Sequence, residues 1–214
     1  GEDAEHLSEV ITTTTMMIFK DPSTFKRAAT SIHWHPDTTE LRVGVTYAML
    51  RFQQMPKDMP RESFIWNLNE PNFPEKTLLP PSPLCSLAFN PKNANLVVGG
   101  SYNGSLSFFD LSVGSASGVI RPIKTTVLEK SHHDPVYDVQ WSTVGQSGSE
   151  CFSISTDGRL LWWTTRTLKA FQETNLFLMT RSHARMVWSI RLWAVLLSSI
   201  TLRSVHLSTL LVLS

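Results

Sequence analysis

The sequence predicts an all-β chain that forms part of a β-propeller, with about three four-stranded blades followed by an apolar C-terminal tail outside the propeller. Three observations lead to this prediction. A strand that ends in an aromatic residue recurs along the chain, a later strand of each unit ends in an aromatic residue followed by a polar one, and two units contain a tight-turn dipeptide. A period of ~40–50 residues with several short strands per unit is typical of propeller blades.

The first strand of each unit alternates apolar and polar residues before its terminal aromatic side chain. These aromatic residues are Trp34, Phe89 and Trp141, which are spaced by 55 and 52 residues. Alternation with a period of two places every second side chain on the same face of a strand. We therefore expect the three residues to occupy equivalent positions in successive blades.

The third strand of each unit ends in a second recurring pair, an aromatic residue followed by a polar one. The pairs are Trp66-Asn67, Phe109-Asp110 and Trp163-Thr164, with spacings of 43 and 54 residues between the aromatic members. Trp66 and Phe109, like the first-strand residues, are predicted to be structural aromatic residues of the blades.

Tight turns separate the middle strands of the second and third units. Asn103-Gly104 and Asp157-Gly158 each lie between two β-rich runs, and a two-residue hairpin needs positive φ angles that Asn, Asp and Gly tolerate. The first unit has a longer loop instead, roughly residues 53–62, which contains Met and Pro. Such loops at a rim are good contact points for partners.

These repeats divide the chain into three parts. Residues 1–20 form an N-terminal arm, residues 21–168 form three blades at about 28–80, 81–130 and 131–168, and residues 169–214 form an atypical apolar tail. From Thr174 onward the tail has no Asp, Glu, Lys, Gly or Pro. A fourth blade is expected there, but no blade pattern is present.

A membrane-spanning helix is one interpretation of the tail. Arg191 and Arg203 leave uncharged windows of only 11 residues, 192–202 and 204–214, whereas a spanning helix needs about 20 apolar residues. A membrane partner is therefore not expected. Two interpretations remain open: a Leu-rich helix packed on the exposed blade edge, or a stretch that comes from an altered reading frame or a retained intron.

Composition narrows the class of protein. The 19 basic and 18 acidic residues give a formal net charge of +1, and no clustered Lys/Arg excess exists of the kind that nucleic-acid binding requires. Cys85 and Cys151 lie in apolar runs, which favours two buried free thiols in a reducing compartment over a disulfide. The acidic N-terminus does not resemble a secretory signal.

No candidate for catalysis, cofactor binding or metal binding emerges. His33 and His35 alternate on one strand, but two ligands without nearby Cys or acidic residues do not make a metal site. His132-His133-Asp134 has the composition of a catalytic group, yet no nucleophile motif accompanies it. No Gly-rich phosphate loop is present.

The third unit resembles a WD40 repeat. In that family a His, a Ser or Thr, an Asp and a Trp form a buried hydrogen-bond tetrad within one blade. The matching residues here are His132, Ser153 or Ser155, Asp157 and Trp163, and of the two serines we assign Ser155. The second unit has an incomplete tetrad with Asn103 and Phe109, and the first unit has none that can be assigned.

Several stretches together are similar to the dynein intermediate chain family. They are residues 18–22 (IFKDP), 34–37 (WHPD), 63–72 (SFIWNLNEPN), 87–92 (LAFNPK), 99–104 (GGSYNG), 131–138 (SHHDPVYD) and 155–158 (STDG). The resemblance covers about residues 15–168. Each piece is weak alone, but the combination is specific and is closest to the axonemal outer-arm branch of the family.

This resemblance implies a non-catalytic scaffold of ciliary outer-arm dynein, located in the cytoplasm and in the axoneme of cilia or flagella. The implied partners are the tail of a dynein heavy chain, a second intermediate chain and, through the N-terminal arm, light chains. Residues 12–19 match the place where family members have a strand that closes the ring with the last blade. A generic WD40 adaptor of another multiprotein complex is the alternative function.

Overall fold

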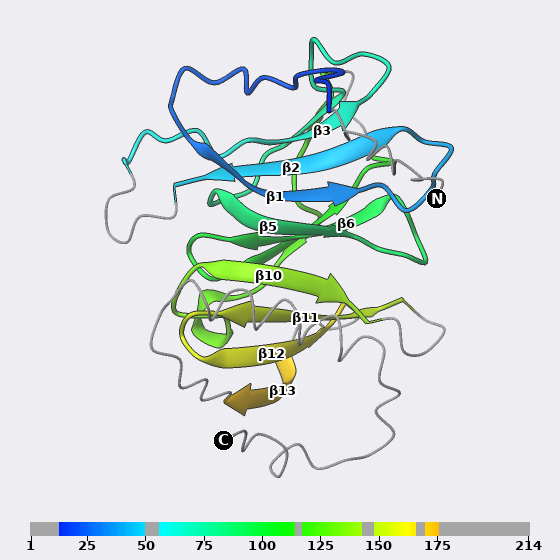
Figure 1. Cartoon of the computed structure of the whole chain (residues 1–214). Coiled ribbons are helices and arrows are strands. Elements are labelled where there is room, and N and C mark those ends of the chain that lie inside the picture. Colours follow the sequence, from blue (N-terminus) through cyan, green and yellow to red (C-terminus); the bar gives the residue numbers. More distant parts are fainter. Residues whose placement is uncertain (1–12, 50–55, 114–116, 143–147, 166–169, 176–214) are drawn as a thin grey trace, which may run out of the picture.

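The computed structural model describes residues 13–49, 56–113, 117–142, 148–165 and 170–175, and these form three β-sheets stacked in chain order (Figure 1). The prediction of an all-β partial propeller is confirmed, and each sheet corresponds to one blade. The first blade contains β1 (Ala28–Trp34), β2 (Arg42–Ala48), β3 (Ser63–Asn67) and β4 (Lys76–Leu78). The second contains β5 (Leu84–Phe89), β6 (Leu96–Ser101), β7 (Leu106–Asp110) and β9 (Lys124–Thr125). The third contains β10 (Val136–Trp141), β11 (Glu150–Ser155), β12 (Arg159–Thr164) and β13 (Ala170–Asn175).

The three blades share one pairing register, which shows that the sequence repeat is also a structural repeat. The predicted first-strand aromatics pair with equivalent residues of the second strand, in Trp34↔Val43, Phe89↔Val97 and Trp141↔Cys151. Those second-strand residues pair in turn with the predicted third-strand aromatics, Trp66, Phe109 and Trp163. A register shift also recurs near the start of each first strand, between Ala29 and Ser31, Leu84 and Ser86, and Val136 and Asp138.

Apolar side chains fill the space between successive blades. One buried cluster joins Ile65 and Leu78 of the first blade to Leu87, Phe89 and Phe109 of the second. A second cluster joins the second blade to the third, with these members among others: Ala88, Val98, Phe108, Val139, Trp141 and Trp163. Each first-strand aromatic of the second and third blades therefore packs backwards onto the preceding blade. Burial of this apolar surface stabilises the stack of blades.

The first sheet has a fifth strand that comes from the second repeat. β8 (Val119–Ile120) pairs in parallel with β4, and the backbone amides of Thr77 and Leu79 donate to the carbonyls of Gly118 and Ile120, both at 2.9 Å. The sequence did not predict this strand, because a two-residue parallel pairing between distant segments leaves no local pattern. It links the first two blades at the outer edge.

The predicted end of the third blade was wrong. β13 (Ala170–Asn175) pairs with β12 through five residue pairs, from Arg159↔Asn175 to Trp163↔Ala170, so the blade continues past residue 168 into the predicted tail. An edge strand is held by backbone hydrogen bonds on one side only and needs little side-chain pattern, which is why the boundary was placed too early. The rest of the tail, residues 176–214, lies outside the described residues. Whether it is a packed helix or a stretch from an altered reading frame or retained intron therefore stays a prediction.

Residues 13–19, within the predicted ring-closing strand, form no strand in the structure. Met16 and Ile18 are exposed there, while Phe19 packs on Trp66. The described residues include no last blade with which this segment could pair, so the ring-closing role stays a prediction.

Candidate functional site

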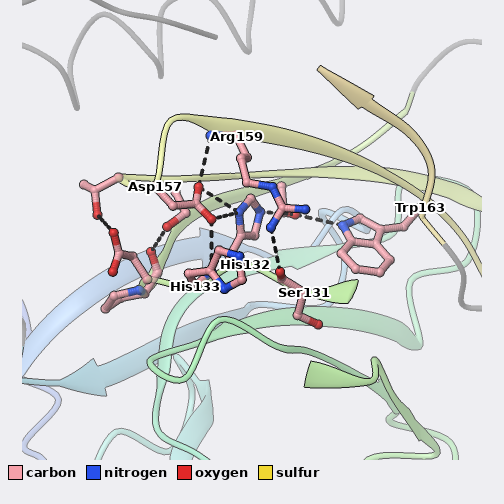
Figure 2. Close-up of polar contacts among 11 residues, drawn as sticks. Ser131, His132, His133, Asp157, Arg159 and Trp163 are labelled. Atoms are coloured by element: carbon pink, nitrogen blue, oxygen red, sulfur yellow. Dashed lines mark hydrogen bonds and ion pairs between the residues drawn. The ribbon is translucent and has the colours of Figure 1, made fainter. Parts of the chain in front are cut away.

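A buried hydrogen-bond network links four side chains of the third blade (Figure 2). His132 Nε2 lies 2.8 Å from Ser153 Oγ, and Trp163 Nε1 donates to the same oxygen at 2.8 Å. On the other side of the ring, His132 Nδ1 lies 3.1 Å from Asp157 Oδ2. With the Nδ1 proton on the Asp157 side, the serine hydroxyl donates to Nε2 and accepts from the tryptophan, so both ring nitrogens of His132, the Ser153 hydroxyl and the Trp163 N–H all have partners.

The serine of this network is Ser153, and the assignment of Ser155 was wrong. Ser155 Oγ instead donates to the carbonyl of Pro135 at 2.9 Å. Residues two apart on a strand share one face, so the sequence pattern does not distinguish the two serines. The tertiary structure does, because only Ser153 lies between the imidazole of His132 and the indole of Trp163.

Asp157 fixes the turn that carries the network. Its carboxylate accepts the backbone amides of His133 and Arg159, both at 3.0 Å, in addition to the imidazole of His132. Burial raises the pKa of Asp157, but the hydrogen bonds from His132 and from the backbone amides of His133 and Arg159 lower it by more, and the net pKa lies below its usual value. Arg159 Nη1 also donates to the carbonyl of Ser131 at 3.0 Å, a contact that sequence reasoning missed.

The position of Ser153 is occupied by an apolar residue in each of the other two blades. Register places Gly99 of the second blade and Val45 of the first at the position of Ser153. A Cβ atom on Gly99 would lie 2.7 Å from Leu84 Cδ1, so a leucine side chain occupies this place. Asn103 caps its own turn, accepting the amide and the hydroxyl of Ser105 at 3.2 and 2.7 Å. The second blade therefore packs through hydrophobic contacts where the third uses hydrogen bonds.

The hairpin glycines behave as the sequence predicts. Gly104 and Gly158 have φ angles of +89° and +79°, in the left-handed region that favours glycine. Gly104 also lies directly under the third blade, since a Cβ atom there would collide with the backbone carbonyl of His132. The turn of the second blade thus holds the histidine of the network in place.

The blade aromatics do not share one environment. Trp66 and Phe109 are fully buried, Phe89 and Trp141 are 3% and 4% exposed, but Trp34 is 62% exposed. Trp141 Nε1 donates to the carbonyl of Ala88 in the preceding blade at 3.0 Å. The described residues contain no blade before the first one. Trp34 therefore ends its strand as predicted but does not pack between blades.

The remaining polar candidates are structural. His33 and His35 lie beside the ring of Phe89, with centroid distances of 5.9 and 5.1 Å. Within the described ranges no group of three His, Cys, Asp or Glu side chains could hold a metal ion. Cys85 and Cys151 are free and buried, and burial raises the pKa of the Cys85 thiol to about 12 and that of Cys151 further still. Neither thiol is a nucleophile at neutral pH. In the described part of the chain, no helix has the length and apolar character to cross a membrane.

Comparison with known proteins identifies the family. No protein-family model matches the chain. The 70 kDa intermediate chain of flagellar outer-arm dynein from Chlamydomonas reinhardtii is 43% identical over 164 residues, which cover 77% of this chain and 28% of that protein. Dynein axonemal intermediate chain 2 of Xenopus laevis is 45% identical over 156 residues, covering 73% and 25%. The chain is a homologue of the axonemal dynein intermediate chains. The resemblance seen in its motifs is thereby confirmed.

Similarity to cytoplasmic dynein is lower. The cytoplasmic dynein 1 intermediate chain of Drosophila melanogaster is 31% identical over 151 residues, covering 69% of this chain and 21% of that protein.

The chain spans only about a quarter of the length of the axonemal relatives it matches. The aligned lengths of 164 and 156 residues are comparable to the combined length of the three blades.

Proposed function

We propose that this chain is a non-catalytic scaffold subunit of ciliary outer-arm dynein, in which the propeller binds the tail of a heavy chain. The identity of 43–45% to axonemal and flagellar outer-arm intermediate chains over about three quarters of the chain carries the proposal. The side chains are consistent with it, since an extended polar network joins Ser153, His132, Asp157 and Trp163 to each other within the third blade. These four side chains bond to one another, which is the arrangement expected of a group that stabilises a fold.

By this proposal the subunit helps to assemble the motor or to anchor it on axonemal microtubules. It is located in the cytoplasm and in the axoneme. A second intermediate chain is the expected neighbour, as are light chains where an N-terminal arm is present. The blades provide a rigid surface for such contacts, because their positions relative to each other are fixed by two apolar clusters.

Co-sedimentation tests the proposal. The tagged chain is expressed in ciliated cells, axonemes are extracted with salt, and the extract is separated on a sucrose gradient. We expect the tag, and a peptide from residues 131–159, to travel with the outer-arm heavy chains. Sedimentation apart from all dynein chains would contradict the proposal and favour the alternative, an adaptor in another multiprotein complex.

A matched pair of variants makes the test specific to the fold. Asp157→Ala removes the carboxylate that three donors share and disrupts the third blade. Asp37→Ala changes an exposed aspartate whose carboxylate accepts hydrogen bonds from Thr39 in the same loop. We expect the first variant to be lost from the heavy-chain fractions and the second to remain. If neither variant is lost, association with the heavy chains does not depend on an intact third blade. If both are lost, the loss is not specific to the third blade.

A further inference from the structure

Arg27 is a buried cation just before the first blade. Its side chain is 0% exposed and pairs with Asp21, which is itself only 17% exposed. Nε and Nη2 donate to the two carboxylate oxygens of Asp21 at 2.7 and 2.9 Å, which is the bidentate geometry of a strong ion pair. Nη1 donates to the backbone carbonyls of Pro60 and Glu62 at 3.0 and 2.7 Å. One guanidinium thus joins the segment around Asp21 to the backbone at residues 60–62.

The same guanidinium lies over an aromatic face of the first blade. Its carbon is 5.0 Å from the ring centre of Tyr47 and 5.7 Å from that of Phe64, within the range of cation–π attraction. Two residues before Asp21 the chain also carries Phe19, whose ring centre lies 5.3 Å from that of Trp66. The N-terminal segment is therefore held on this face by an ion pair and by aromatic contacts.

This face points away from the second blade. Gly44 and Ile65 contact the second blade, and their neighbours in β2 and β3 point the opposite way because side chains alternate along a strand. Those neighbours form a separate buried cluster of Val43, Val45, Tyr47, Phe64 and Trp66. On the second and third blades, the corresponding face is covered by the preceding blade. On the first blade, Phe19 and Arg27 of the N-terminal segment lie against it, together with Leu68 just after β3.

We propose that Arg27 is a positioning residue, which fixes residues 19–27 on the outward face of the first blade. The N-terminal arm is then not tethered by a free linker. It leaves the propeller at one place and in one direction, set by the guanidinium and its four oxygen acceptors. Any partner that binds the arm is held at a fixed position relative to the blades.

Lysine cannot replace Arg27 in this role. A single ammonium group keeps the charge, but it cannot present donors to a carboxylate and two carbonyls in the planar arrangement that a guanidinium provides. Arg27→Lys is therefore the informative change, and Asp21→Asn is its counterpart on the acceptor side. Arg42→Lys is the matched control, because Arg42 pairs with Glu40 and Glu75 at a partly exposed site of the same blade.

Two measurements on the 214-residue chain test the proposal. Hydrogen exchange follows the amide of Ser23, which donates to Asp21 Oδ1 at 3.0 Å. Electron–electron distance measurements use nitroxide labels on cysteines introduced at the exposed positions of Lys20 and Lys92. The two native cysteines are buried with raised pKa values and do not compete for the label.

We expect Arg27→Lys and Asp21→Asn to accelerate Ser23 exchange about tenfold or more, which corresponds to losing at least one charge-assisted hydrogen bond. The distribution of distances between the two labels should broaden in these variants. The exchange rates of the strand amides in the third blade should not change, and the Arg42→Lys control should behave like the unchanged chain in both measurements. Unchanged exchange and a narrow distance distribution in Arg27→Lys would overturn the proposal. An equal acceleration of the third-blade amides would overturn it too, since Arg27 would then support the whole fold rather than position one segment.

Discussion

Ser153→Ala, compared with Ser155→Ala, tests the assignment of the network. The two serines lie on the same strand face and are both buried. Removing the Ser153 hydroxyl leaves Trp163 Nε1 and His132 Nε2 without their partner, and an unsatisfied buried polar group costs about 1–3 kcal/mol. The expected loss is therefore about 2–5 kcal/mol. Ser155→Ala removes one ordinary hydrogen bond, to the carbonyl of Pro135, and is expected to cost about 1 kcal/mol.

Urea unfolding followed by circular dichroism measures both changes. A difference of several kcal/mol is a large part of the roughly 5–15 kcal/mol that stabilises a typical domain, so the midpoints separate clearly. The double variant Ser153→Ala/Trp163→Phe should cost less than the sum of its single changes, because the second change removes the stranded donor. Equal midpoints for the two serine variants, or simple additivity of the double variant, would refute the network as described.

Three further comparisons probe the packing of the blades. Gly104→Ala should destabilise the chain by more than Gly118→Ala in urea unfolding, because both glycines have positive φ but only at Gly104 does a Cβ collide with the carbonyl of the network histidine. Burial lowers the pKa of His33 below its usual 6.5. The stability that the neutral imidazole contributes is therefore present above pH 6.5 and is lost as the pH falls through the lowered pKa of the folded state. His33→Gln should therefore reduce the fall in urea midpoint between about pH 7.5 and pH 5, and an unchanged fall would contradict this reasoning. Trp141→Ala should cost about 3–5 kcal/mol, whereas Trp34→Ala should lower the thermal midpoint of the isolated chain only slightly, since Trp34 is already exposed.

The strand framework was predictable from local patterns. Alternation and turn dipeptides located the strands that end at Trp34, Phe89 and Trp141, and the hairpins at Asn103-Gly104 and Asp157-Gly158. These signals are local, because a strand face and a tight turn are each set by a few neighbouring residues. The parallel strand β8 and the edge strand β13 were not found, since both depend on backbone pairing with segments that their own side chains do not specify.

The family resemblance was also contained in the sequence, because several short motifs occur together in one order. The sequence did not contain the choice between Ser153 and Ser155. It did not contain the role of Arg27 either, because the acceptors of Arg27 lie six residues away at Asp21 and more than thirty residues away at Pro60 and Glu62.

Repeat spacing, alternation and turn chemistry by themselves determined that this chain forms successive β-blades, and a combination of short motifs carried the resemblance to dynein intermediate chains. Only the tertiary structure decided which serine completes the third-blade network, which aromatic residue stays exposed, and how the N-terminal segment is held. The physical reason is that periodicity assigns a side chain to a face of a strand. Which atoms it meets on that face depends on the distance and direction of groups that are remote in the chain.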